Sequence, residues 1–300
     1  MQLTIRNLSK RYANGVQALD RVSLTVPPGM FGLLGPNGAG KSTLMRTLAT
    51  LQDADAGSAR LGQVDVLRDK DAVRHMLGYL PQDFGVYPKV SAEELLDHLA
   101  RLKGLDDKVT RRDVVATLLK QTNLHDVRKK ALGSFSGGMR QRFGIAQALL
   151  GDPKLIIVDE PTAGLDPEER VRFHNLLADI GENVIVILST HIVSDVSDLC
   201  ADMAIINKGR VLLTGQPQSL TARLEGRVWQ KAIARSDLDA TKAELPVIST
   251  RLVGGRTLVN VVSDGAPAAG FAPVEATLED VYFAAISGRL DATVAAIEAA

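Results

Sequence analysis

The stretch that most constrains the fold of this chain is rich in glycine and spans residues 32–43. From Gly35 to Ser42 it matches the phosphate-binding loop pattern G-x-x-x-x-G-K-[ST]. Gly38 and Gly40 lack a Cβ atom, so the backbone can bend tightly and bring its N–H groups close to phosphate oxygens. Such a loop lies between a buried strand and a helix. The local fold is therefore expected to be strand, loop and helix.

The residues on either side of the loop fit this expectation. Residues 30–34 have the pattern of a short buried strand, and residues 43–48 that of a helix, whose dipole places its positive end at the loop. In such a site Lys41 reaches the β- and γ-phosphates, and the Ser42 hydroxyl binds Mg²⁺. The alternative is a glycine-rich turn that fits the pattern by chance, and the flanking strand and helix disfavour it. The nucleotide-binding residues predicted in the loop are Gly35, Pro36, Asn37, Gly38, Ala39, Gly40, Lys41, Ser42 and Thr43.

Apolar patterns along the chain extend this unit into an α/β fold. Residues 2–9 and 22–26 largely alternate apolar and polar residues, as half-buried strands do. Residues 155–158 and 184–188 form continuous apolar runs, typical of strands that are buried on both faces of a sheet. Residues 76–82 are also expected to form a strand. Strands that alternate with helices indicate a largely parallel sheet with ligands at the strand ends.

Two further regions interrupt or follow this core. Ser91 and Glu94 form a capping box, and periodic leucines behind it predict helices, so residues 83–150 are expected to form an inserted helical subdomain. After residue 217 the periodicity weakens, although residues 247–262 could form a hairpin and residues 277–286 a helix. The last residues, 292–300, are rich in alanine. We therefore expect a nucleotide-binding domain over residues 1–220 and a small accessory domain over residues 221–300.

The composition argues against several other classes of protein. Lysine plus arginine and aspartate plus glutamate both number 35, and this balance argues against a dedicated nucleic-acid binder, which usually has a basic excess. Cys200 is the only cysteine, so no disulfide can form within the chain, and we expect it to be a small core residue. The longest apolar run, residues 281–286, is far shorter than the roughly 20 residues of a membrane helix. The N-terminus lacks the layout of a signal peptide, so a cytoplasmic protein is expected.

Further motifs follow the phosphate loop in a fixed order. In chain order they are Gln82, the segment Phe135-Ser136-Gly137-Gly138-Met139, the pair Asp159-Glu160, Asp166 at a predicted helix start, and His191. With these motifs the chain resembles the nucleotide-binding subunits of ATP-binding cassette (ABC) transporters over about residues 1–220. The resemblance implies an α/β fold with a P-loop NTPase core, an N-terminal antiparallel β-subdomain, the inserted helical subdomain and the small C-terminal accessory domain.

The resemblance also implies a role for each motif in binding and hydrolysing ATP with Mg²⁺. Tyr12 matches the aromatic residue that stacks on adenine, although a strand-end tyrosine with a buried ring and a solvated hydroxyl remains the alternative. Gln82 matches the glutamine that meets Mg²⁺ and the attacking water, and Asp159 the aspartate that holds the Mg²⁺ water shell beside Ser42. Glu160 matches the general base, and His191 the histidine at the γ-phosphate.

The segment from Phe135 to Met139 matches the family signature, whose amides grip the γ-phosphate held by a second subunit. This chain has Phe135 where leucine is usual and Met139 where glutamine is usual, and both changes leave the Ser136 hydroxyl and the glycine amides in place. Asp166 matches the residue that communicates between the two sites of the dimer, and it follows Ala163 where serine is commoner. The resemblance therefore implies a second nucleotide-binding subunit, in a homodimer.

The expected function is an ATPase that powers a membrane transporter through a separate transmembrane permease. The Met139 variant, the helical insert and residues 277–282 look most like subunits of drug, antibiotic or lipid exporters. Such a subunit is cytoplasmic and peripheral on the inner face of the cell membrane. One alternative is a soluble cassette ATPase that acts on nucleic acid or ribosomes. A regulatory nucleotide-binding module without turnover is another, and the presence of both Glu160 and His191 disfavours it.

Overall fold

The computed structural model describes residues 1–181 and 184–290, so the alanine-rich stretch 292–300 lies outside the described residues. At its centre is a six-stranded sheet that is parallel except for one edge strand, β10. In spatial order the strands are β10 (Arg210–Gly215), β9 (Asp202–Asn207), β3 (Gly29–Leu34), β8 (Ile185–Thr190), β7 (Leu155–Asp159) and β6 (Leu77–Leu80). The expected P-loop core with a mostly parallel sheet is confirmed.

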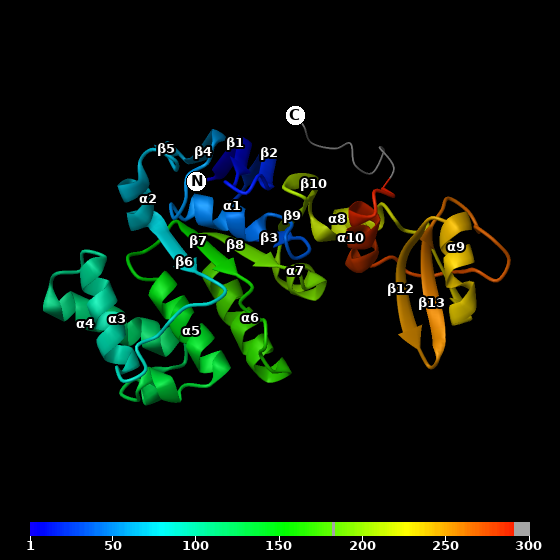
Figure 1. The fold of residues 1–300 in the computed structure, drawn as a ribbon. Helices are drawn as coiled ribbons and strands as arrows, with labels where there is room; N and C mark the ends of the chain where they lie inside the picture. The colour runs from blue at the N-terminus through cyan, green and yellow to red at the C-terminus, as the bar shows by residue number, and fades with distance from the viewer. Residues whose placement is uncertain (182–183, 291–300) are drawn as a thin grey trace.

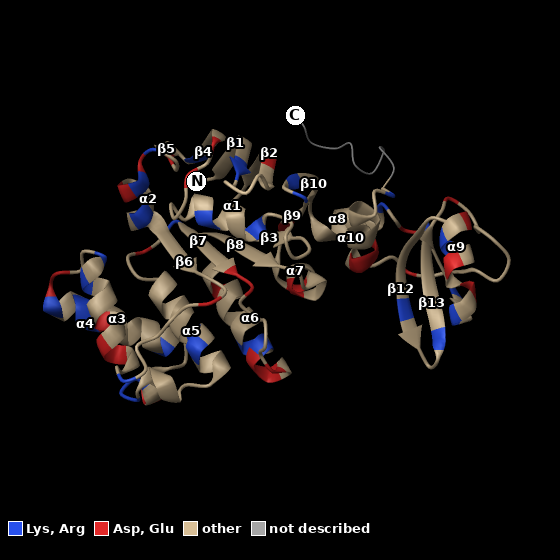
Figure 2. Cartoon of the chain, viewed as in Figure 1, with Lys and Arg blue, Asp and Glu red and all other residues tan. Residues whose placement is uncertain are grey.

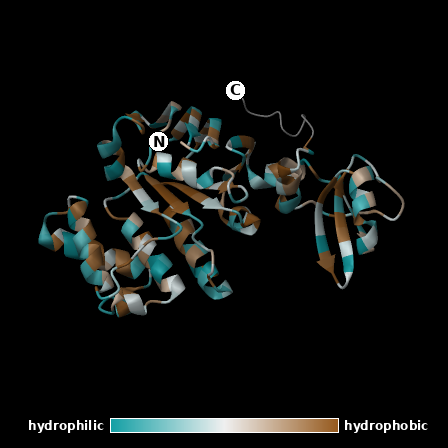
Figure 3. Cartoon of the chain, in the orientation of Figure 1, coloured by the Kyte–Doolittle hydropathy of each residue, from teal (hydrophilic) through white to brown (hydrophobic). Residues whose placement is uncertain are grey.

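The central strands of this sheet have apolar residues at successive positions, so side chains on both faces are buried. In β7, Leu155 and Ile157 belong to one hydrophobic core, while Ile156 and Val158 belong to the other. The first core packs against α1 (Lys41–Leu48) and an N-terminal sheet, and the second against α5 (Gly137–Ala148), α6 (Pro167–Gly181) and α7 (Val193–Leu199) (Figure 1). Cys200 is buried in this second core, as expected. Figure 3 shows the apolar residues concentrated along the central strands.

The N-terminal sheet is antiparallel, in agreement with the expected subdomain. Its strands, in spatial order, are β2 (Gln17–Val26), β1 (Leu3–Arg11), β4 (Ala56–Leu61) and β5 (Val64–Asp65). The helix α2 (Lys70–Met76) follows it and was missed in the sequence. Because Met76 ends this helix, the strand expected over residues 76–82 is shorter and is limited to β6, Leu77–Leu80.

The inserted helices form a subdomain with its own hydrophobic core. They are α3 (Ala92–Leu102), α4 (Lys108–Gln121), the short 3₁₀ turns η1 (His125–Val127) and η2 (Leu132–Ser134), and α5. The capping box at the start of α3 is confirmed, because Ser91 and Glu94 each bond the other's backbone N–H. Acidic and basic residues are interspersed over these and the other outer helices (Figure 2).

The C-terminal part contains a second antiparallel sheet and a helix that returns to the ATPase core. The sheet order is β12 (Val247–Val253), β13 (Arg256–Val262), β11 (Val228–Ile233) and β14 (Ala272–Pro273), with η3 (Arg235–Asp237) and α9 (Leu238–Glu244) between β11 and β12. The hairpin and the helix expected in this region are both confirmed. That helix, α10 (Leu278–Ile286), packs on α7 and on α8 (Pro217–Ala222), and Val281 joins the core under the central sheet.

Among the residues that the structure describes, none of the helices is both long and apolar enough to cross a membrane.

Candidate nucleotide site

The phosphate loop joins β3 to α1, and its glycines occupy positions that other residues could not. Gly38 and Gly40 have φ angles of 77° and 107°, in the left-handed region that favours glycine. A Cβ atom on Gly35 would lie 2.4 Å from the Ile206 carbonyl oxygen, and one on Gly40 would lie 2.5 Å from the Ala18 carbonyl oxygen. The loop is therefore held tightly between β2 and the end of β9, with its backbone fixed at the start of α1.

The ammonium group of Lys41 lies under this loop and is buried. Its Nζ donates hydrogen bonds to the carbonyl oxygens of Gly35 at 2.6 Å and Pro36 at 3.3 Å. The same Nζ lies 3.3 Å from the Glu160 Oε1 atom, in a pair that is about 5% and 7% exposed. Lys41 is thus oriented by the loop's own backbone and faces one negative charge.

Glu160 connects the phosphate loop to His191. Its other carboxylate oxygen, Oε2, lies 2.6 Å from His191 Nδ1 at the end of β8. The backbone of Glu160 has a φ angle of 51°, which is uncommon for a residue with a side chain, and its N–H donates to the Ser189 carbonyl oxygen. The fold therefore brings together Lys41, Glu160 and His191, which the sequence places far apart.

Asp159 and Ser189 provide oxygens that suit a metal ion. The two residues are register partners on β7 and β8, and both are buried. Asp159 Oδ1 and Ser189 Oγ have no hydrogen-bond partner among the described residues, an arrangement that needs an explanation in a folded protein. Carboxylate and hydroxyl oxygens are ligands that Mg²⁺ prefers, directly or through water, so these residues fit Mg²⁺. Burial and the charge of Asp159 also raise the pKa of Tyr79 on β6.

Tyr12 lies beside the helix that follows the loop. Its hydroxyl is 3.0 Å from Thr43 Oγ1 and donates to Gln52 Oε1 at 3.3 Å, and the residue is 37% exposed. The residue is thus partly exposed and its hydroxyl is bonded, whereas the sequence-based alternative expects a buried ring and a solvated hydroxyl. Gln52 was missed in the sequence, and its amide also donates to the Thr43 carbonyl oxygen.

Two predicted residues, Gln82 and Asp166, lie at the surface. Gln82 follows β6 and is exposed. Asp166 is also exposed, and its Oδ1 accepts a hydrogen bond from the Glu169 N–H at 2.9 Å. Asp166 therefore caps α6, as the sequence predicts for this helix start.

The signature segment lies at the start of α5. Ser136 is the N-cap, and its Oγ accepts a hydrogen bond from the Met139 N–H at 3.1 Å. Phe135 is buried in the core of the helical subdomain. A Cβ atom on Gly138 would lie 2.2 Å from the Glu169 carboxylate, whereas one on Gly137 would meet nothing within 4 Å. The segment is thus packed from behind and open in front.

The structure also places Thr162 and Asp195 close to this site, and neither was singled out in the sequence. The Thr162 hydroxyl donates to Asp195 Oδ2 at 2.6 Å, and both residues are buried. Each stands near a predicted residue in the chain, Thr162 two positions after Glu160 and Asp195 four positions after His191. That spacing is the only signal in the sequence, because the contact itself joins two distant segments.

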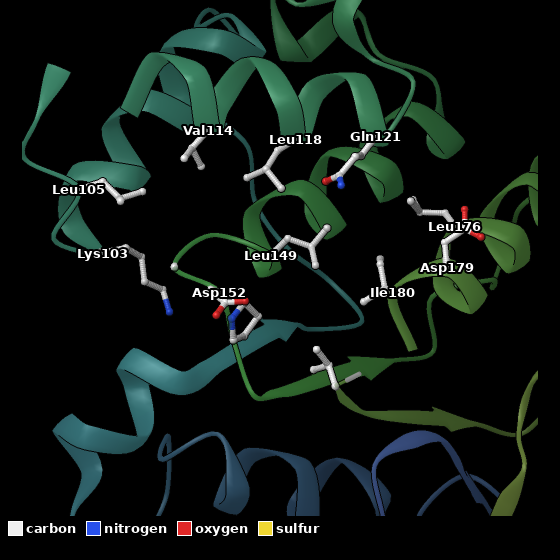
Figure 4. A pocket seen from close by; sticks show the side chains of 13 residues that line it. Lys103, Leu105, Val114, Leu118, Gln121, Leu149, Asp152, Leu176, Asp179 and Ile180 are labelled. Atoms are coloured by element: carbon white, nitrogen blue, oxygen red, sulfur yellow. The ribbon is translucent and has the colours of Figure 1, made fainter. Parts of the chain in front are cut away.

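A separate hollow lies between the helical subdomain and α6 (Figure 4). Val114, Leu118, Leu149, Leu176 and Ile180 make it largely apolar, with Asp152 and Asp179 among its polar residues. It contains none of the predicted site residues, and its lining comes from α4, α6, the end of α5 and the segments that follow α3 and α5. The chemistry of the nucleotide site therefore lies elsewhere, at the carboxyl ends of β3, β7 and β8.

Comparison with known proteins agrees with this geometry. Residues 19–163 match the family described as "ABC transporter". The chain is 33% identical over 262 residues to the probable multidrug ABC transporter ATP-binding protein YbhF of Escherichia coli, covering 85% of this chain and 45% of that protein. It therefore spans less than half of the length of YbhF.

Two other relatives are covered more completely. The uncharacterized ABC transporter ATP-binding protein YxlF of Bacillus subtilis is 31% identical over 296 residues, covering 93% of this chain and 98% of that protein. The daunorubicin/doxorubicin resistance ATP-binding protein DrrA of Streptomyces peucetius is 37% identical over 217 residues, covering 72% of this chain and 66% of that protein.

A solved structure shares the fold of a large part of the chain. It is the dimeric, post-hydrolysis ATP-binding cassette MJ0796 bound to ADP and Pi, with a TM-score of 0.65, 25% identity, and coverage of 71% of this chain and 98% of that chain. The match in fold, the family region and YxlF, which shares nearly its full length with this chain, all agree. The chain belongs to the ABC transporter family, among its ATP-binding proteins.

Proposed function

We propose that this chain binds and hydrolyses ATP with Mg²⁺ and so powers a membrane transporter through a separate permease subunit. The observation that carries the proposal is the Glu160 carboxylate, which lies between the Lys41 ammonium and the His191 ring beside a phosphate loop. A carboxylate in this position can accept a proton from water, while Lys41 and the loop amides hold the phosphates.

Each predicted residue has a task in this proposal. The residues from Gly35 to Thr43 surround the phosphates, and Tyr12 stacks on the adenine ring. Ser42, Gln82 and Asp159 would hold Mg²⁺, which neutralises charge on the β- and γ-phosphates when it is bound. Glu160 orients and polarises the attacking water, and His191 contacts the γ-phosphate.

A second copy of the chain completes the site. Ser136 and Gly137 are exposed at the start of α5, and they would meet the γ-phosphate held by the phosphate loop of the partner subunit. The dimeric state of the MJ0796 cassette supports this arrangement. Asp166, exposed at the start of α6, would then lie near the contact between the two sites and communicate between them.

The names of the relatives support the proposed direction of transport. YbhF and DrrA carry names of multidrug transport and drug resistance, so we propose an exporter whose ATP-binding subunit is peripheral on the inner face of the cell membrane. The permease would contact the region where α2, β6 and α3 form a hollow. Leu51 and Leu102 line this hollow with 63% and 71% of their surface exposed, which suits an apolar segment of a partner.

Two measurements test the proposal. The purified chain should hydrolyse ATP, and chelation of Mg²⁺ should abolish the reaction. The chain should also sediment with membranes when it is co-expressed with its permease, and Leu102→Asp should weaken this association. Leu252→Asp is a matched control, because Leu252 is 65% exposed on β12, outside the proposed contact. Absence of ATP binding would remove the proposal, and association with ribosomes or DNA instead of membranes would favour the soluble alternative.

A further inference from the structure

A buried carboxylate, Asp195, connects the segment that carries Glu160 with the segment that carries His191. Asp195 lies on α7, and none of its surface is exposed. Its Oδ2 accepts the hydroxyl of Thr162 at 2.6 Å, and its Oδ1 accepts Arg170 Nε at 2.8 Å. His174 Nε2 lies 2.9 Å from the same Oδ1. One carboxylate therefore binds the loop after β7, α6 and α7 together.

The contact reaches the catalytic pair through short and stiff connections. Thr162 follows Glu160 with only Pro161 between them, and the proline ring fixes its own φ angle. Asp195 follows His191 by four residues, and its N–H donates to the Ile192 carbonyl oxygen. Ile192 in turn donates its N–H to the hydroxyl of Thr190 at the end of β8. A displacement of either partner therefore moves Glu160 relative to His191.

The backbone of Glu160 makes such a support necessary. Its left-handed φ angle of 51° persists only where the surroundings determine it, and its N–H is held by the Ser189 carbonyl oxygen on the upstream side. On the downstream side, the Thr162 hydroxyl on Asp195 is the buried side-chain bond that anchors the loop before α6. The bonds to Ser189 and to Asp195 therefore hold the chain on either side of Glu160, the proposed general base.

We propose that Asp195 and Thr162 are positioning residues for ATP hydrolysis, which hold Glu160 against His191 without touching the nucleotide. The inference rests on the proposed function, since it assigns to these residues an effect on the hydrolytic step. The Arg170 guanidinium pairs with the Asp195 carboxylate, His174 lies against the same oxygen, and Arg170 also donates to the Ser194 hydroxyl. Loss of the Thr162 hydroxyl alone should therefore release the loop and leave the rest of the cluster paired.

The test compares two substitutions of Thr162. Thr162→Val keeps the shape and removes the hydroxyl, whereas Thr162→Ser keeps the hydroxyl. Thr162→Val should lower kcat about 10- to 100-fold while the KM for ATP changes less than about threefold, because the reacting groups are misplaced rather than the binding site lost. Thr162→Ser should retain most of the wild-type kcat.

Thr122→Val is the matched control for the loss of one buried hydroxyl. Thr122 is fully buried in the helical subdomain, and its hydroxyl donates to the Leu118 carbonyl oxygen at 2.8 Å. Both valine variants should lower the midpoint of thermal unfolding to a similar extent, but only Thr162→Val should lower kcat. A wild-type kcat in Thr162→Val, or an equal loss in Thr162→Ser, would overturn the inference. Neither result would affect the proposed function, which fails only if the wild-type chain does not hydrolyse ATP.

Discussion

The phosphate loop and the signature segment would face the same nucleotide in the proposed dimer, yet their surroundings within one chain differ. The Lys41 ammonium is buried and has two carbonyl oxygens and the Glu160 carboxylate around it. Ser136 and Gly137 are exposed, and a Cβ atom on Gly137 would meet no other atom within 4 Å. The Lys41 ammonium thus already has its partners within its own chain, whereas the start of the signature segment is open to another molecule.

The phosphate loop and the signature segment also differ in how they are held in place. The phosphate loop is fixed on the side that faces its own chain, where Gly35 and Gly40 lie against neighbouring backbone and Lys41 pairs with Glu160. The signature segment is fixed only from behind, where Phe135 is buried and Gly138 meets the Glu169 carboxylate. A surface that is held in shape but left open is suited to receive a group from another molecule, as the proposed dimer requires.

The largest expected effect concerns the hydrolytic step at Glu160, beside the phosphate loop. Glu160→Gln should retain ATP binding and lose turnover by about 10²- to 10⁴-fold, the usual contribution of a general base. The measurements are the Kd for ATP and the ATPase rate of the purified variant. Asp280→Asn is a control, because Asp280 is another buried carboxylate and lies outside the site, on α10. Near-normal hydrolysis by Glu160→Gln would take Glu160 out of this role.

The second prediction separates the phosphate loop from the signature segment by placing one damaging substitution in each. Lys41→Ala should fail at phosphate binding, and Ser136→Arg should fail because a bulky cation fills the open notch. Each variant alone has two damaged sites in a homodimer. A mixture of the two variants forms some dimers in which both lesions share one site and the other site is intact, so part of the ATPase activity should return on mixing.

The outcome of mixing depends on whether one intact site can turn over alone. ATP-dependent dimerisation of Glu160→Gln should therefore be measured beside it by size-exclusion chromatography. No dimer in that experiment, together with no recovery on mixing, would contradict the assignment of Ser136 to the partner's site.

Sequence patterns were sufficient to predict the phosphate loop and most of the strands of the core. The phosphate loop, the buried strands and the residues Asp159, Glu160 and His191 could be placed because each is tied to a local pattern of glycine, apolar runs or strand ends. The paired geometry of Lys41 and Glu160 follows once β3 and β7 are placed in one sheet.

Other features depend on contacts between distant segments and left no local signal. Asp195 lies on a short helix, and only its burial and its contacts with Thr162, Arg170 and His174 distinguish it from a solvated carboxylate. α10 was expected as a helix, but its return to the core on α7 and α8 depends on which apolar face it meets. The helix α2 is short and has one buried residue, Val73, so it lacks the periodic face that marks a helix in sequence.

A smaller effect is expected at the adenine ring. If Tyr12 stacks on the base, Tyr12→Ala should weaken ATP binding by about 1–3 kcal/mol, whereas Tyr12→Trp should largely preserve it. Tyr12→Phe should also largely preserve ATP binding, because the ring is kept and the hydroxyl bonds only Thr43 and Gln52 of its own chain. Isothermal titration calorimetry with ATP would measure these differences. Equal dissociation constants for all three variants would leave Tyr12 as a structural residue at the edge of the site.

The smallest expected effect distinguishes the capping role of Ser136 from its proposed role toward the partner. Within one chain its hydroxyl accepts the Met139 N–H and caps α5, and loss of such a cap typically costs about 0.5–2 kcal/mol of stability. Ser91 caps α3 in the same subdomain by a similar bond to Glu94, so Ser91→Ala is a matched control.

Both alanine variants should lower the midpoint of thermal unfolding by a few degrees, since about 1 kcal/mol shifts it by only that much in a domain of this size. Only Ser136→Ala should also reduce the ATPase rate, because in the proposed dimer its hydroxyl would face the partner's phosphates, whereas that of Ser91 would not. Equal ATPase rates in the two variants would mean that the Ser136 hydroxyl serves α5 alone, and that the glycine amides carry the contact across the dimer.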